Sequence, residues 1–364
     1  MSRFFSRALS GLEAYVPGEQ PQDRSYIKLN TNESPYPPSP SVLKVINSSQ
    51  AELLRLYPDP TCKRLKEALA REYGLSYKNI FVSNSSDEVL GAAFTAYCAG
   101  SGRVYFADIT YGFYKVFAEL QRAKVTVISL GDDLSICCRD YFDLEPGLIV
   151  IANPNAPTGI ALPAEDIRKI ALSNKDSVVL VDEAYVDFGG ESSVSLISEL
   201  KNLIVTRTYS KSMSMAGARL GFAMADPELI SDLERIKYST NPYSVNRLSL
   251  EAGIAALEEM DYYRENCKRI AMQRDKTTKE LEALGFSHTE SRANFIFAKS
   301  DSVPGKRLFE RLRSAGILVR RFDAPRIGEY LRITVGTEND MAALVAEIER
   351  IIEDEKRTDS KKDE

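Results

Sequence analysis

The strongest constraint on the fold is a series of short, continuous apolar runs in the first two thirds of the chain. Segments of helical character, such as PAEDIRKIALSNK, separate the runs, which read RVYFAD, KVTVISL, GLIVIANP, SVVLVDEAY and NLIVTRTYS. Continuous apolar runs indicate strands buried on both faces, because a strand exposed on one face alternates apolar with polar residues. Strands that alternate with helices therefore predict an α/β fold with a mainly parallel sheet flanked by helices.

The pattern changes after about residue 240 to long charged helices, followed by strands at NFIFAK, ILVRRF and LRITVG and by a last helix. Apolar residues at helical spacing predict the buried face of that helix: Leu344, Val345, Ile348, Ile351 and Ile352. We expect an N-terminal arm over residues 1–50, a large domain over 51–250 and a smaller α/β domain over 251–364. The charged tail from about residue 356 is expected to be disordered.

Composition excludes several classes of function. The net charge is −5 with both signs spread along the chain, so nothing indicates a nucleic-acid or membrane surface. No run approaches the roughly 18 apolar residues of a membrane span, and we expect a cytoplasmic protein. The five cysteines form no CxxC pair, and His288 is the single histidine, so neither a metal site nor a Ser-His-Asp triad is expected.

Polar residues follow three of the predicted strands, where open parallel sheets bind their ligands. The turn Ser83–Glu88 begins a helix whose free N–H groups could seat a phosphate. Asp182 ends a second strand, and Lys211, with Arg219 beyond it, follows a third. Each has an ordinary alternative: a helix N-cap, a buried salt bridge, or a surface lysine whose stem packs on apolar neighbours.

Taken together, the three signals fit a single ligand. A helix start for a phosphate, an acid for a basic ring nitrogen and an amine for an aldehyde match the three groups of pyridoxal phosphate. We therefore interpret the strand ends as a cofactor site.

The chain resembles the fold type I pyridoxal-phosphate aminotransferases, and among them the histidinol-phosphate aminotransferase family, from about Gly11 to about Ile351. The motifs occur in family order and read LNTNESPYPPSP, RLYPDP, VSNSSDE, TYGFY, NPNAPTG, VDEAY, YSK, GARLGF, VRRF and YLRITVG. The resemblance implies a large domain with a mainly parallel sheet, a smaller α/β C-terminal domain, pyridoxal 5'-phosphate as cofactor and a homodimer.

The resemblance also implies roles for individual residues. Lys211 would bind the cofactor aldehyde and act as general base, Asp182 would hold the ring nitrogen protonated and Tyr185 would contact the ring oxygen. Tyr57 would reach the cofactor phosphate of the partner subunit, and Tyr111 would stack on the ring. The other implied cofactor contacts are Ser86, Asp87, Asn155, Ser210 and Arg219, and the implied substrate contacts are Tyr15, Asn32, Arg320 and Arg332.

Two positions depart from the family pattern. Ser85 replaces a glycine of the phosphate-binding turn, which costs strain if φ is positive there. Ala156 replaces an asparagine that contacts the ring oxygen. We expect either Asn155 to make that contact through a shifted backbone, or Tyr185 and a water molecule to replace it.

The resemblance implies a transaminase that interconverts L-histidinol phosphate and 2-oxoglutarate with imidazole acetol phosphate and glutamate, in histidine biosynthesis. The expected partners are these small molecules and a second copy of the chain, with no nucleic acid and no membrane. Aromatic amino acids remain possible substrates, because related aminotransferases take them with similar residues. A lyase similar to threonine-phosphate decarboxylase and a non-catalytic cofactor-binding protein also remain open.

Overall fold

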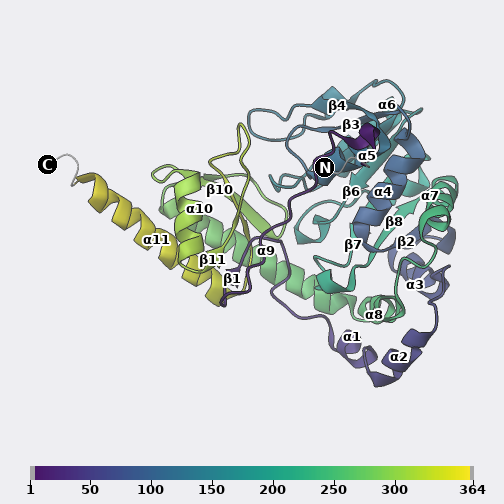
Figure 1. Cartoon of the computed structure of the whole chain (residues 1–364), viewed down its shortest axis with the longest axis horizontal. Helices are drawn as coiled ribbons and strands as arrows, with labels where there is room; N and C mark the ends of the chain where they lie inside the picture. The colour runs from purple at the N-terminus through teal and green to yellow at the C-terminus, as the bar shows by residue number, and fades with distance from the viewer. Residues whose placement is uncertain (1–4, 361–364) are drawn as a thin grey trace.

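A computed structural model describes residues 5–360 of the chain, which form a larger and a smaller lobe joined by a long helix (Figure 1). The larger lobe is built on a seven-stranded sheet with the order β2-β8-β7-β6-β5-β3-β4. Its strands are β2 (Ile80–Ser83), β3 (Arg103–Ala107), β4 (Lys124–Ile128), β5 (Leu148–Ala152), β6 (Val178–Asp182), β7 (Leu203–Thr208) and β8 (Gly221–Ala225). Strands β3 to β7 pair in parallel, and only β8 runs against its neighbours. The prediction of a mainly parallel sheet is confirmed.

Helices cover both faces of this sheet. They are α3 (Lys63–Tyr73), α4 (Ser85–Cys98), α5 (Phe113–Gln121), α6 (Ala164–Ser173), α7 (Pro227–Thr240) and α8 (Arg247–Leu257). Val179 and Val181 of β6 pack into a core with α3, α6 and α8, whereas Leu180 packs into a second core with α4, α5 and α7. Because successive residues of the inner strands enter opposite cores, these strands read as continuous apolar runs. The edge strand β4 differs, since four of its five residues are exposed.

The smaller lobe has a four-stranded antiparallel sheet of order β12-β13-β10-β9, reached through the long helix α9 (Met260–Ala283). Its strands are β9 (Phe286–His288), β10 (Phe295–Ser300), β12 (Arg320–Arg321) and β13 (Leu331–Thr334), and its helices are α10 (Gly305–Ser314) and α11 (Glu338–Ser360). The N-terminal segment joins this lobe, because β1 (Ile27–Lys28) pairs in parallel with β11 (Ile317–Leu318). It then continues through α1 (Pro40–Val45) and α2 (Ser48–Glu52) to the larger lobe.

The remaining helical elements are short 3-10 helices. They are η1 (Arg7–Leu9), η2 (Leu53–Arg55), η3 (Tyr77–Asn79), η4 (Cys138–Tyr141), η5 (Val186–Phe188), η6 (Ser193–Ser198) and η7 (Ala216–Ala218). No helix within residues 5–360 combines the length and the apolar composition needed to cross a membrane.

Two local expectations differ from the structure. The tail expected to be disordered from about residue 356 is helical as far as Ser360, because α11 continues to that residue, and residues 361–364 lie outside the described residues. Strand β8 was not expected from the sequence, since its first residues, Gly221 and Phe222, belong to the binding motif GARLGF. The apolar face of α11 agrees with the prediction, with Leu344, Ile348 and Ile351 fully buried.

Replacing Gly221 with alanine is expected to destabilise the larger lobe. A β-carbon on this first residue of β8 would overlap the backbone of Ser85 and Ser86, where α4 begins. Those atoms can move aside only if the pairing of β2 with β8 shifts. We expect a loss of about 1–3 kcal/mol in the free energy of unfolding, measured by urea denaturation.

Gly217→Ala provides the matched control for this measurement. Nothing lies within 4 Å of a β-carbon at Gly217, so the free energy of unfolding should stay the same or rise slightly. Equal stability of the two alanine variants would contradict the close approach at Gly221.

Candidate active site

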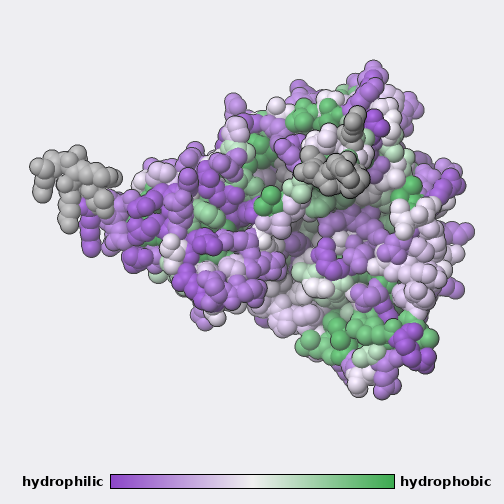
Figure 2. Space-filling view, in the orientation of Figure 1, coloured by the Kyte–Doolittle hydropathy of each residue, from purple (hydrophilic) through white to green (hydrophobic). Residues whose placement is uncertain are grey.

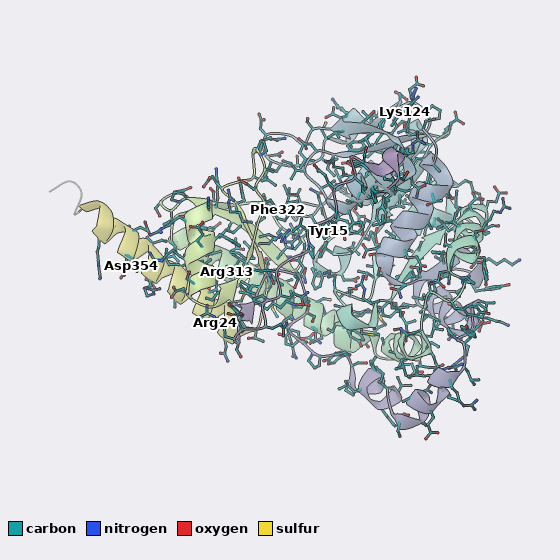
Figure 3. The ribbon with its side chains drawn as sticks, in the orientation of Figure 1. Tyr15, Arg24, Lys124, Arg313, Phe322 and Asp354 are labelled. Atoms are coloured by element: carbon teal, nitrogen blue, oxygen red, sulfur yellow. The ribbon has the colours of Figure 1, made fainter. Side chains whose placement is uncertain are left out.

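A cavity of about 440 Å³ opens where the carboxyl ends of β5, β6 and β7 meet the N-terminal segment and the smaller lobe. Tyr15 and Phe322, which lie between the two lobes in Figure 3, mark the side of the cavity away from the sheet. The predicted site residues that line the cavity are Tyr15, Asn32, Ser86, Asp87, Tyr111, Asp182, Tyr185, Ser210, Lys211, Arg219, Arg320 and Arg332. The fold therefore brings most of the predicted site together.

Lys211 follows β7 by three residues, and its amine faces the cavity. Its Nζ donates a hydrogen bond to the backbone oxygen of Thr31 at 3.1 Å and lies 5.9 Å from the ring centroid of Tyr185. Desolvation, with a further contribution from the positive charge of Arg332, lowers the pKa of Lys211 to about 8. A larger share of this amine is therefore uncharged near neutral pH than for an ordinary lysine, which makes it a nucleophile and a base.

Asp182 ends β6 on the floor of the cavity. Its carboxylate accepts hydrogen bonds from the hydroxyl of Tyr114 at 2.9 Å and from the backbone N–H of Ala184 at 3.2 Å. Burial raises the pKa of Asp182 to about 6, although both hydrogen bonds act in the opposite direction. A buried carboxyl of this kind gains most from a cationic N–H group placed against it.

Tyr114 was not predicted as a site residue, because an aromatic residue in a helix usually belongs to the core. It is fully buried in α5, and its ring meets that of Tyr111 edge-on at 5.5 Å. Its position three residues after Tyr111, in the same TYGFY motif, is the sequence signal that could have identified it. The hydroxyl links Tyr114 directly to Asp182.

The turn between β2 and α4 forms the end of the cavity suited to a phosphate. Ser85 has a φ of 67°, so the serine does carry the backbone strain that a glycine would avoid, at a cost of about 1–2 kcal/mol. Its N–H is held by the backbone oxygen of Arg219 at 3.0 Å. Asp87 accepts hydrogen bonds from Tyr111 and from the Arg219 guanidinium, each at 3.1 Å. A helix N-terminus and a positive charge thus meet at this point.

Two arginines of the smaller lobe, Arg320 and Arg332, line the cavity. Arg332 donates to the backbone oxygen of Asn30 at 3.2 Å, while its buried Nε has no acceptor among the described residues. Arg320 donates to the backbone oxygens of Val16 and Pro17 at 2.9 and 3.1 Å. An unsatisfied guanidinium N–H inside a cavity favours binding of an anion such as a carboxylate or a phosphate.

Asn32 and Tyr185 form a connected pair beside these arginines. The side-chain amide of Asn32 donates to the Tyr185 hydroxyl at 3.0 Å, and its carbonyl accepts from Thr334 of β13 at 3.0 Å. The pair therefore joins the N-terminal segment, the larger lobe and the smaller lobe at the cavity wall.

Two predicted residues do not line the cavity. Asn155 is turned into its own loop, where its amide donates to the backbone oxygen of Ile109 at 2.9 Å and its carbonyl accepts from Thr110 at 2.8 Å. The structure therefore gives no support to a contact between Asn155 and the cofactor ring, and Tyr185 is the alternative that faces the cavity. Tyr57 is 78% exposed and stacks on Tyr243, with ring centroids 4.6 Å apart.

Other cavity residues were also missed from the sequence. Glu33 pairs with Lys28 at 2.8 Å, and Phe322 lies under the guanidinium groups of Arg320 and Arg332 at 5.6 and 5.5 Å. Both line the cavity. Both residues lie within motifs from which other residues were predicted, and only the tertiary structure shows that their side chains point into the cavity.

A mainly parallel sheet that carries an amine and a buried acid at adjacent strand ends, beside an arginine at a helix start, has the architecture of a fold type I aminotransferase. Residues 24–348 match the model of the aminotransferase class I and II family. The histidinol-phosphate aminotransferase of Marinomonas sp. strain MWYL1 is 50% identical over 96% of this chain and 100% of its own length. That of Clostridium acetobutylicum is 46% identical over 97% of this chain and 100% of its own length.

Solved structures agree with these relatives. Histidinol-phosphate aminotransferase from Sinorhizobium meliloti, in complex with pyridoxal-5'-phosphate, superposes with a TM-score of 0.81 at 26% identity, over 91% of this chain and 92% of that one. A putative histidinol-phosphate aminotransferase from Erwinia carotovora atroseptica gives 0.83 at 25% identity, over 94% and 99%. The chain belongs to the histidinol-phosphate aminotransferases, within the class I and II aminotransferase family.

Tyr114→Phe should move the pH profile of the enzyme. Loss of the hydroxyl removes a hydrogen bond to the Asp182 carboxylate, so the pKa of Asp182 rises further above its usual value. The ionised carboxylate is the form that can hold a protonated ring nitrogen, and the acid limb of the activity profile should therefore shift to higher pH. A second readout is weaker retention of pyridoxal phosphate on dialysis.

Tyr105→Phe is the control for Tyr114→Phe. It also deletes the hydroxyl of a buried tyrosine, one that donates to the backbone oxygen of Glu145 at 3.0 Å, remote from Asp182. We expect this variant to lose some stability but to keep the wild-type pH profile. If both variants show the wild-type acid limb, Tyr114 does not act through Asp182.

The lowered pKa of Lys211 predicts how fast cofactor-free protein captures pyridoxal phosphate covalently. Only the neutral amine attacks an aldehyde, so the rate should rise about tenfold per pH unit below the pKa. It should level off above about pH 8, where the amine is largely neutral. Stopped-flow absorbance measures this rate, and a rate still rising between pH 9 and 10 would indicate an ordinary lysine.

Proposed function

We propose that this chain is a pyridoxal-phosphate-dependent transaminase that interconverts L-histidinol phosphate and 2-oxoglutarate with imidazole acetol phosphate and glutamate, a step of histidine biosynthesis. The observation that carries the proposal is one cavity that holds the Lys211 amine, the buried Asp182 carboxyl and an unsatisfied Arg332 guanidinium. The names of the curated relatives support the choice of substrate.

The residues present fit pyridoxal phosphate in three respects. Lys211 offers an amine for the aldehyde, and Asp182 offers a buried acid for the ring nitrogen. The N-terminus of α4, with Arg219 beside it, offers N–H groups and positive charge for the phosphate. When bound, the cofactor supplies an electron sink for the carbon from which a proton is removed.

The chain's own residues then handle protons and charge. With the cofactor bound, the Lys211 amine would act as the base that accepts the proton from the substrate carbon. Asp182 in its ionised form would hold a protonated ring nitrogen. The Tyr185 hydroxyl, which accepts a hydrogen bond from Asn32 at 3.0 Å, would donate to the ring oxygen.

The two arginines fit the anionic groups of both substrates. Histidinol phosphate carries a phosphate, and glutamate and 2-oxoglutarate carry carboxylates, which a guanidinium fork binds equally well. Arg332 lies within the cavity and has a free Nε, whereas Arg320 must exchange the backbone oxygens of Val16 and Pro17 for the ligand. We propose that Tyr15 contacts the same anionic end.

We also propose that the active form is a cytoplasmic homodimer. A green, apolar area lies near α1 and α2 at the lower right of Figure 2. The exposed apolar side chains of this segment are Leu43, Ile46, Leu54 and Leu56, and the exposed Tyr57 follows them in the chain. Exposed patches of this kind mark interfaces in soluble proteins. Tyr57 is 78% exposed and does not line the cavity of its own chain, which supports a contribution to the site of the partner subunit.

A half-reaction tests the function. Histidinol phosphate alone, added to the cofactor-loaded protein, should convert the visible absorbance of the bound cofactor to that of its amine form, and 2-oxoglutarate should restore it. The Lys211→Ala variant should remain folded by circular dichroism and show neither change.

Each alternative function gives a different result in this experiment. Conversion by phenylalanine or tyrosine but not by histidinol phosphate would identify an aromatic aminotransferase. Release of carbon dioxide without need for 2-oxoglutarate would identify a lyase. A bound cofactor that never exchanges its amino group would identify a non-catalytic protein.

Subunit mixing tests the homodimer. If Tyr57 acts across the interface, Tyr57→Ala and Lys211→Ala subunits are each nearly inactive alone but complement each other when mixed. Random exchange makes half of the dimers mixed, each with one intact site, so activity should recover to about a quarter of wild type.

The matched control mixes Tyr111→Ala with Lys211→Ala. Tyr111 and Lys211 line the cavity of the same chain, so no mixed dimer regains a complete site and activity should stay low. Recovery in the control mixture, or none in the Tyr57 mixture, would contradict the proposed exchange of Tyr57.

A further inference from the structure

A cysteine and a lysine meet in the larger lobe, outside the active-site cavity. Cys62 precedes the first turn of α3, and Lys237 lies in α7, 175 residues later in the chain. Their Sγ and Nζ atoms are 3.7 Å apart, and both residues are buried, with 3% and 4% of their surface exposed. A thiol and an amine are thus held in contact with little water between them.

Lys237 is unusual among the buried amines of this region. Its Nζ donates to the backbone oxygen of Val82 in β2 at 2.8 Å, and among residues 5–360 no carboxylate forms an ion pair with it. The neighbouring Lys66, in contrast, is paired with Glu234. The amine beside the sulfur is therefore the one without a carboxylate partner.

Cys62 combines nearby positive charges with a route of access. Burial raises the pKa of its thiol, while the charges of Lys237 and Lys66 oppose that shift. The residue also lines a separate cavity of about 200 Å³, together with Arg64 and Arg247. The cavity gives a small neutral oxidant such as hydrogen peroxide a route to the sulfur, and the two nearby lysines offset part of the burial that disfavours the reactive thiolate.

We propose that Cys62 and Lys237 are an oxidative cross-linking site, at which hydrogen peroxide joins Sγ to Nζ through a covalent sulfur–nitrogen bond. In the first step the thiolate attacks one peroxide oxygen and the O–O bond breaks. The products are a sulfenic acid on Cys62 and a hydroxide, which takes up a proton from solvent and becomes one water, so the sulfur loses two electrons and the peroxide gains them.

In the second step the Lys237 amine, after loss of its proton to water, attacks the sulfur. The S–N bond forms as the S–O bond breaks, and the hydroxyl leaves as a second water. One peroxide is consumed and two waters are released in all, with no further oxidant. Condensation of a sulfenic acid with a neighbouring nitrogen is established chemistry for cysteine, and here the nitrogen already lies in contact with the sulfur.

Comparison with another buried cysteine, Cys98, shows how the surroundings of Cys62 differ. The Cys98 thiol donates to the backbone oxygen of Phe94 within its own helix at 3.0 Å, and burial alone raises its pKa to about 12. No lysine contributes to its environment, which makes Cys98 the natural control for reaction at Cys62.

Peptide mass spectrometry of the peroxide-treated holoenzyme tests the proposal. Trypsin should yield a joined pair of the peptides Leu56–Lys63 and Ile236–Arg247, about 2 Da lighter than the sum of the two free peptides. Cleavage after Lys237 should be blocked, and dithiothreitol should release both peptides. Dimedone, which traps sulfenic acids, should reduce the yield when it is present during oxidation.

Variants and alternative products decide the outcome. Cys98→Ser should still form the joined peptide pair, whereas Cys62→Ser and Lys237→Arg should not. If Lys237→Arg fails to fold, fragmentation of the wild-type pair identifies the joined residues by itself.

The proposal is overturned if Cys62 stops at sulfenic or sulfinic acid with Lys237 still cleavable by trypsin, or if Cys62 does not react. A pair about 14 Da heavier than the two peptides would also overturn it, because that product retains an oxygen between sulfur and nitrogen.

Discussion

Burial of the central sheet on both faces is the constraint on which the rest of the structure depends. Successive residues of β6 enter different hydrophobic cores, Val179 and Val181 on one side and Leu180 on the other. A sheet covered in this way can place polar groups only at the ends of its strands. Asp182 and the segment leading to Lys211 therefore emerge at one edge, where the cavity opens.

The electrostatics of the cavity follow from this placement. Desolvation shifts the two reactive groups toward their neutral forms: the pKa of Lys211 falls to about 8 and that of Asp182 rises to about 6. Tyr114 counters the shift at Asp182 through its hydrogen bond of 2.9 Å. The site thus holds an amine poised as a base and an acid poised to bind a cation, which is the pairing that transamination requires.

Much of the fold and of the site could be predicted because the signals are local. The apolar runs predicted β3 to β7, and the residues after them supplied Asp182, Lys211 and Arg219, all of which reach the cavity. Prediction failed where a side chain's direction depends on distant packing. Asn155 turns into its own loop, and the hydroxyl of Tyr114 reaches from α5 to Asp182. The spacing of Tyr114 from Tyr111 could mark it as a candidate, but its contact with Asp182 depends on packing between distant segments.

The sequence by itself determined the alternation of strands and helices, the polar residues at the strand ends and the order of the family motifs. Only the tertiary structure decided the positive φ of Ser85, the inward direction of Phe322 and Arg332, and the contact between Cys62 and Lys237. The physical reason is the range of the interactions. Hydrophobic periodicity and turn chemistry act between residues close in sequence, whereas desolvation and side-chain contacts arise between segments that only folding brings together.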